Sequence, residues 1–165
     1  MIGTEEGFEI ERGFPFSAGN GVTEIAVTTR RPVLSIRPKA TFNSIVNRGR
    51  IDPESVAINV GSGTVLVEIV YGGALTGASF GSAAATSIVE FDVAATAITG
   101  GTTTYARHAG STSGTIRGNE ISNLLSRLPL TLNAAGTNPI PLSVVATAFT
   151  GSVDVAAQLN WREMR

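Results

Sequence analysis

The sequence contains no cysteine and only one histidine, His108. Without cysteine there is no disulfide, zinc–thiolate site, iron–sulfur cluster or thiol nucleophile. A hydrolytic triad needs a nucleophile, a base and a group that orients the base, and His108 is the one imidazole available to it. It stands in the turn-like stretch YARHAGSTSG, where a lone histidine is far more often a surface residue than a base. We therefore expect a protein that is not an enzyme and has no catalytic residue.

Charged residues are scarce as well, at 15% of the chain against an ordinary value of about 25%. Glycine, alanine, serine and threonine take their place, which suits a protein that buries surface in an assembly or an all-β protein with Ser/Thr-rich faces. The net charge of −1 offers no electrostatic reason to expect nucleic acid or an anionic membrane as a partner. The uncharged run 128–153 contains Pro129, Pro139 and Pro141, which exclude a membrane-spanning helix there.

The few charges are unevenly placed. Residues 1–24 contain Arg12 and five acids, Glu5, Glu6, Glu9, Glu11 and Glu24. Residues 30–50 contain no acid and six bases, Arg30, Arg31, Arg37, Lys39, Arg48 and Arg50. One interpretation is solvated strand faces and turns. The other is an acidic arm that meets a basic patch on the same chain or on a neighbour, with Glu5, Glu6, Glu9, Glu11, Arg30, Arg31, Arg48 and Arg50 as candidate assembly contacts.

Helical periodicity is nearly absent. Only the stretch 118–128 places apolar residues at i, i+3, i+4 and i+7, which suggests a short helix or turn. Elsewhere, β-branched or alternating segments are separated by glycine-rich turns. The predicted strands are 22–29, 32–38, 54–60, 64–71, 87–93, 102–107, 128–132, 142–149 and a final strand from 153. This spacing predicts an all-β fold, an antiparallel β-sandwich or jelly roll with an extended N-terminal arm.

We expect one β-sandwich domain over residues 21–165, preceded by an extended arm or entering strand over residues 1–20. The final strand alternates apolar and polar residues and contains the only tryptophan, Trp161. The link at 150–152 is short enough for a hairpin, so we expect this strand to pair with 142–149. Val155, Leu159 and Trp161 are then predicted core residues that close one end of the sandwich.

Two further patterns were candidates for sites. Gly-Ser-Gly at 61–63 lacks the lysine and the following helix of a phosphate loop, so it indicates a hairpin turn. Glu90 and Asp92 share one face of a predicted strand, a spacing compatible with glycosidase carboxylates or a calcium site. An outward-facing polar side of a half-buried strand is the better interpretation, and we expect no metal and no cofactor.

Four segments stand out by their order along the chain: PVLSIRPKATFNSIVNRGRIDPESVAI (32–58), VEIVYGGALTGASF (67–80), VEFDVAATAITGG (89–101) and VDVAAQLNWREMR (153–165). Together they resemble a β-rich C-terminal domain found in structural proteins of tailed bacteriophage virions, in the fibre or on the head surface. The family pattern is a strand with SIR, a strand ending in residues like LTGASF, a D-x-AATA-x-TGG turn and a terminal strand ending in LNWRE. The resemblance covers roughly residues 30–165 and supplies no catalytic or binding residues.

The resemblance implies a non-enzymatic structural protein located in the virion and assembled in the host cytoplasm. Longer relatives carry a large lectin-like region before this domain, whereas about 30 residues precede it here, which favours a capsid decoration or cement protein over a tail fibre. Proteins of that class are commonly trimers, so the expected partners are the major capsid protein, or fibre and neck components, and further copies of this chain in a homotrimer. One alternative is a receptor-binding knob of a tail or neck fibre, with loops 72–87 and 108–119 as its contacts. A glycan-degrading tailspike fragment is disfavoured by the scarcity of acids.

Overall fold

The computed structural model describes residues 13–111 and 129–165. Every regular element in these two ranges is a β-strand, which confirms the all-β prediction. The stretch 118–128, predicted as a short helix or turn, lies outside the described residues. Glu5, Glu6, Glu9 and Glu11 of the predicted arm also lie outside them.

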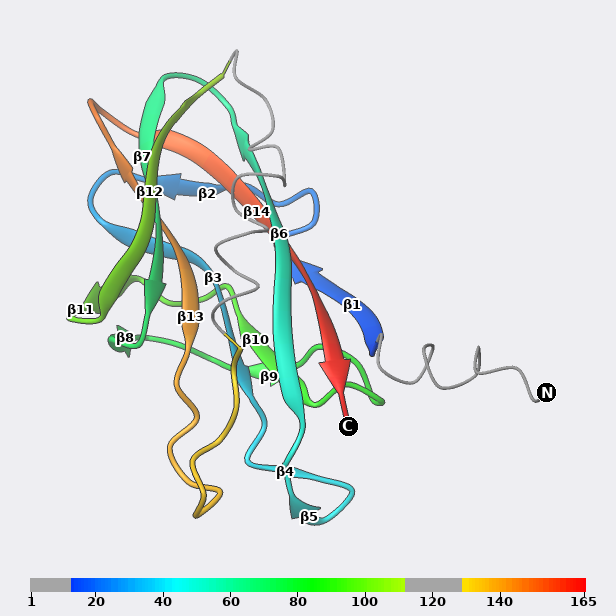
Figure 1. Ribbon diagram of the computed structural model, residues 1–165. Helices are drawn as coiled ribbons and strands as arrows, with labels where there is room; N and C mark the ends of the chain where they lie inside the picture. Colours follow the sequence, from blue (N-terminus) through cyan, green and yellow to red (C-terminus); the bar gives the residue numbers. More distant parts are fainter. Residues whose placement is uncertain (1–12, 112–128) are drawn as a thin grey trace.

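The strands form two antiparallel sheets that face each other as a β-sandwich (Figure 1). In sheet A, β14 (Val153–Met164) pairs with β6 (Arg50–Val60) along one edge. Along its other edge it pairs with β2 (Ile25–Val27) near its start and with β1 (Phe14–Gly19) near its end. Sheet B has the order β12 (Thr102–Gly110), β7 (Thr64–Tyr71), β13 (Leu142–Ala148), β3 (Arg31–Pro38), β10 (Val89–Asp92) and β9 (Gly81–Ser82). Two short ribbons pair β8 (Ala74–Thr76) with β11 (Ala97–Thr99) and β4 (Thr41–Phe42) with β5 (Ile45–Val46).

The core lies between the sheets and is built from residues at alternate strand positions, which point to the same face of a strand. Val155, Leu159 and Trp161 of β14 have 0% of their surface exposed. They pack in one cluster with residues of sheet B that include Leu34 and Val67. Val155 and Trp161 are six residues apart on an extended strand, so the three residues line the core along β14, whereas the sequence predicted that they would close one end of it.

The predicted hairpin between the last two strands is wrong. β13 pairs with β3 and β7 in sheet B, whereas β14 pairs only with strands of sheet A, so the link 149–152 crosses from one sheet to the other. Gly-Ser-Gly at 61–63 likewise joins β6 of sheet A to β7 of sheet B instead of closing a hairpin. Facing sheets are about 10 Å apart, a distance that three extended residues span. A short glycine-containing link therefore serves either connection, and its length does not decide between them.

Part of the predicted arm belongs to the sandwich. Residues 14–19 of the range 1–20 form β1, which pairs residue by residue with β14, from Phe14 with Glu163 to Gly19 with Gln158. Phe16 of this strand stacks on Trp161, with ring centroids 6.3 Å apart. An arm that is separate from the sandwich therefore ends before Phe14.

A buried polar network closes the core near the C-terminal end of β14. Glu163 has 0% of its surface exposed. Its carboxylate accepts hydrogen bonds from the Ser87 hydroxyl at 2.5 Å, the Ile88 backbone N–H at 2.9 Å and the Trp161 indole N–H at 3.0 Å. Because Ser87 and Ile88 directly precede β10, this Glu163 network ties the end of sheet A to sheet B.

The β8–β11 ribbon adds a third layer on the outer face of sheet B. Val70 of β7 and Val145 of β13 are fully buried beneath it, in a cluster with Ile98 of β11 and Leu75 of β8. This ribbon therefore covers sheet-B side chains that point away from the main core.

The Asp92 carboxylate binds the backbone of two segments that flank this ribbon, one after β8 and one before β11. It accepts hydrogen bonds from the backbone N–H groups of Ser79 at 2.6 Å, Ala94 at 3.1 Å and Ala95 at 3.0 Å. Glu90 and Asp92 do share the face of β10 that points away from the main core. Asp92 nevertheless has only 2% of its surface exposed, because loops that flank the ribbon cover it.

Candidate functional site

The four basic residues predicted as assembly contacts do not form one patch. Arg31 begins β3 of sheet B and Arg30 directly precedes it, whereas Arg50 begins β6 of sheet A and Arg48 lies two residues before it. Their acceptors within the chain are the Glu68 carboxylate for Arg30 (2.9 Å), the Ala95 and Ala26 carbonyls for Arg31 (3.3 and 3.4 Å), the Ala134 carbonyl for Arg48 (2.8 Å) and the Asp52 carboxylate for Arg50 (2.7 Å). Each of these four bases therefore has an acceptor within its own chain, and its contact with the acidic arm stays a prediction, because Glu5, Glu6, Glu9 and Glu11 lie outside the described residues.

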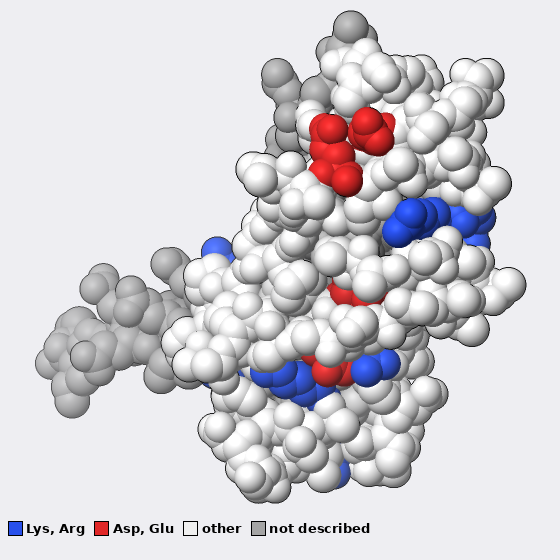
Figure 2. Space-filling view, turned by 180° about the vertical axis from the view of Figure 1, so that it is seen from behind, with Lys and Arg blue, Asp and Glu red and all other residues white. Residues whose placement is uncertain are grey.

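The scarcity of charge is also visible in space. On the face that Figure 2 presents, most of the described surface is uncharged, and acidic and basic side chains occur in small separate groups. Contacts with a partner on this face would depend on shape, hydrogen bonds and apolar area more than on long-range electrostatic steering.

The Arg30–Glu68 ion pair makes the stability of the fold depend on pH. Glu68 also accepts a hydrogen bond from the Thr103 hydroxyl at 2.9 Å. Burial raises the pKa of Glu68, but the hydrogen bonds from Arg30 and Thr103 and the charge of Arg30 outweigh it, so the pKa lies below its ordinary value of 4.5. A carboxyl whose pKa is lower in the folded state stabilises the fold above its unfolded pKa, and this contribution is lost as the pH falls through the folded pKa.

Arg30→Met is expected to lower the free energy of unfolding at pH 7 by about 0.5–1 kcal/mol, the range of a partly exposed ion pair. The side chains of Arg30 and Glu68 are 35% and 12% exposed. The difference between variant and parent should shrink as the pH falls below the ordinary glutamate pKa of 4.5 and through the lower pKa of folded Glu68. Urea denaturation at pH 7 and at about pH 3 measures both effects. A loss of equal size at the two pH values would contradict the assignment to Glu68.

His108 lies in a strand, although the sequence indicated a turn. It belongs to β12, which continues to Gly110. Tyr105–Gly110 of this strand pair residue by residue with β7, from Ile69 back to Thr64. The imidazole is exposed and makes an edge-to-face contact with Phe149, with ring centroids 5.0 Å apart. The part of the GSTSG stretch from residue 112 lies outside the described residues.

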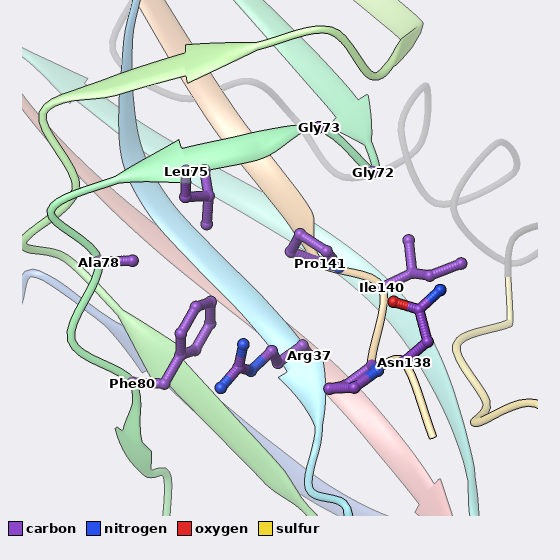
Figure 3. A pocket seen from close by; sticks show the side chains of 10 residues that line it. Arg37, Gly72, Gly73, Leu75, Ala78, Phe80, Asn138, Ile140 and Pro141 are labelled. Carbon is purple, nitrogen blue, oxygen red and sulfur yellow. The ribbon is translucent and has the colours of Figure 1, made fainter. Parts of the chain in front are cut away.

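A groove of about 580 Å³ opens beside the third layer (Figure 3). Its volume lies within the range of about 300–1,000 Å³ that is typical of ligand pockets. One side is formed by the β7–β8 turn, by Leu75 of β8 and by Phe80 in the loop that follows. The opposite side is the segment 138–141, which leads into β13. Arg37, near the end of β3, extends between the two sides (Figure 3).

Arg37 is held in place by two contacts. Its Nε donates a hydrogen bond to Glu90 Oε1 at 2.5 Å, across the β3–β10 pair. Its guanidinium carbon lies 3.8 Å from the centre of the Phe80 ring, a cation–π contact. Within the described residues, neither Nη atom of Arg37 has a hydrogen-bond acceptor. The site therefore presents fixed, unused N–H donors beside a partly exposed carboxylate, because the Glu90 side chain is 22% exposed.

The backbone around the groove is also fixed. The Gly72 N–H donates to the Pro141 carbonyl at 2.8 Å, which joins the β7–β8 turn to the opposite segment. Gly73 has a φ of 91°, and a Cβ there would lie 3.1 Å from the side chain of Ile98. Both the conformation and the close approach favour glycine at this position.

Sequence reasoning missed this groove as a site. It singled out loop 72–87 only as a possible receptor contact and treated Arg37 as one base in a charged run. Glycines 72 and 73 and the Pro-Ile-Pro run at 139–141 are the signals that mark two rigid backbone segments. Nothing in the sequence shows that these segments face each other across Arg37.

Among the residues that the structure describes, no three His, Asp or Glu side chains are grouped so that they could bind a metal ion. The described part of the chain also contains no helix capable of crossing a membrane. Compared with protein-family models, with curated proteins and with solved structures, the chain shows no significant match.

Proposed function

We propose that this protein is a non-enzymatic structural component of a tailed-phage virion, a decoration or cement protein that stabilises the head through subunit contacts. The observation that carries the proposal is the ordered resemblance of four sequence segments to a domain of virion proteins. In the structure these segments supply β14 of sheet A, β3, β7 and β10 of sheet B, and the ribbon of the third layer. The resemblance therefore extends over both sheets and is not confined to one turn or one strand.

An exposed apolar surface offers a contact area for such a role. We call it the β1 patch and define it by Phe14, Phe42, Ile45 and Arg165. Phe14 is 58% exposed and Ile45 is 68% exposed. The guanidinium carbon of Arg165 lies 4.6 Å from the ring centre of Phe14 and 5.5 Å from that of Phe42, and Phe42 pairs with Ile45. The patch lies where the chain enters β1, so the acidic residues 5–11 and the patch can act on the same partner.

The direct test is binding to heads prepared without this protein, from the phage that encodes it. Saturable binding that raises the thermal stability of the heads supports decoration. Binding to host cells without binding to heads would reject decoration and favour the receptor-binding knob. The double variant Phe14→Ser/Ile45→Ser should bind heads at least about tenfold more weakly, because apolar contact area is lost. Phe149→Ser is the matched control, since Phe149 is also 58% exposed but lies next to the opposite end of β14.

Removal of residues 1–12 is expected to weaken head binding and leave the free energy of unfolding unchanged within about 0.5 kcal/mol. Removal of residues 1–20 should weaken binding and also destabilise the fold, because it deletes β1 and the ring that stacks on Trp161. Sedimentation with heads measures binding, and urea denaturation measures stability. Undiminished head binding by the shorter truncation would show that residues 1–12 make no contribution to the contact.

The receptor-binding knob is the second candidate, and one observation favours it. The groove at Arg37 lies in the region of loop 72–87 and has the volume of a ligand site. Recognition of a small receptor group uses a concave site, which a role based on contact area does not require.

A further inference from the structure

We propose that the groove between the β8–β11 ribbon and the segment 138–141 binds a neutral saccharide. This inference does not depend on the proposed role in the virion. The ligand class follows from three features of the groove: its donors and acceptors, its charge and its apolar walls.

The polar groups match those that recognise sugar hydroxyls. Arginine has five N–H donors, and Arg37 uses only its Nε in the contact with Glu90. The Nη groups remain for ligand oxygens, and the exposed Asn138 carboxamide, which also lines the groove, can both donate and accept. Vicinal hydroxyls both donate and accept hydrogen bonds at neighbouring atoms, so they can bond to the donors and the acceptors of the groove at the same time.

The charge of the groove favours a neutral ligand over an acidic one. Glu90 lies 2.5 Å from Arg37, so the pair contributes no net charge. A ligand carboxylate or phosphate placed on the Nη groups would lie close to the Glu90 carboxylate, and like charges repel strongly in a partly desolvated site. A hydroxyl group gains the hydrogen bonds of Arg37 without this repulsion.

The walls supply apolar surface for the C–H faces of a sugar ring. Leu75 and Phe80 lie on one side, and Ile140 and Pro141 lie on the other (Figure 3). The exposed lining of the groove is nevertheless more polar than apolar, so hydroxyl groups can find hydrogen-bond partners along much of it. The contact of Gly72 with Pro141 and the anchoring of the Ser79 N–H by Asp92 hold the two sides in position. The site therefore needs little reorganisation on binding, which reduces the entropic cost.

Titration of the ¹⁵N-labelled protein with lactose, maltotriose and methyl α-mannoside, followed by amide chemical shifts, tests the proposal. We expect at least one of these neutral probes to shift amides of residues 72–80 and 138–142 in a saturable manner. The acidic probe 3′-sialyllactose should bind there no more tightly than lactose. No saturable shift in these two segments with any neutral probe, or binding of sialyllactose about tenfold tighter than lactose, would overturn the proposal.

Two variants assign the binding to the polar groups. Arg37→Met removes the donors and retains an apolar stem, and it should weaken binding about tenfold or more, as for lost hydrogen bonds to a charged group. Arg50→Met is its matched control, because it breaks a similar Arg–Asp pair in sheet A and should leave the affinity unchanged. Asn138→Gly preserves the positive φ of 62° and removes only the carboxamide, so it tests the site even if Arg37→Met fails to fold. Wild-type affinity in Asn138→Gly and in a folded Arg37→Met would overturn the proposal.

Discussion

Trp161→Ala is expected to lower the free energy of unfolding by about 3–5 kcal/mol, the usual cost of removing a large buried aromatic side chain. The indole is fully buried between the sheets, stacks on Phe16 and donates its N–H to Glu163. Alanine would leave a cavity that the surrounding strands cannot fill, because β14 is held on both edges by β1 and β6.

Urea denaturation followed by far-UV circular dichroism measures this loss without depending on the only tryptophan. Phe149→Ala is the control, since its ring is 58% exposed and its loss should cost less than about 0.5 kcal/mol. In the parent protein, the tryptophan emission should be that of an indole shielded from water. A loss below about 1 kcal/mol for Trp161→Ala, or an emission typical of a hydrated indole, would contradict the buried position.

Glu163→Ala is expected to cost about 3 kcal/mol or more, because each buried donor left without an acceptor costs about 1–3 kcal/mol. Three donors lose their acceptor together: the Ser87 hydroxyl, the Ile88 N–H and the Trp161 indole N–H. The change also removes the ion pair of Glu163 with Arg165, whose Nε lies 3.6 Å from the carboxylate. We expect the end of sheet A and the segment 87–88 of sheet B to separate first on heating.

Glu163→Gln separates the hydrogen bonds from side-chain volume. Glutamine fills the same space but turns one acceptor oxygen into an NH₂ donor, so it should cost about 1–2 kcal/mol, less than alanine. Hydrogen exchange at the Ile88 amide reports on the network directly and should accelerate in both variants. If both variants unfold at the same urea concentration as the parent, the network does not tie the two sheets together.

The all-β fold was predictable because its evidence is local. Strand 64–71 was predicted with its observed limits, since β-branched residues bounded by glycines favour an extended chain. The alternation in the final strand also indicated its buried face, because successive side chains point to opposite sides of a strand. Trp161 could be assigned to that face from the sequence alone.

The partners of each strand were not predictable in this way. Links 61–63 and 150–152 both suggested hairpins, yet both connections cross between sheets. Hydrogen bonds between strands join residues far apart in the chain, such as Phe14 with Glu163. The residues of one strand do not indicate which distant strand pairs with it.

The candidate site shows the same limit more strongly. Arg37, Phe80 and Glu90 belong to separate segments, and only the pairing of β3 with β10 and the return of the β8–β11 ribbon over sheet B bring them together. Likewise, no local pattern in the sequence distinguishes Glu163 from other polar residues, but the segment before β10 buries it among three donors.

Composition and alternation were sufficient to identify a cysteine-free β protein with a buried face on its final strand, because backbone geometry and side-chain hydrophobicity act within a few residues. The crossing between sheets, the Glu163 network and the groove were decided by tertiary structure, because their contacts form only when segments up to about 150 residues apart are packed against one another, as Phe14 is with Glu163.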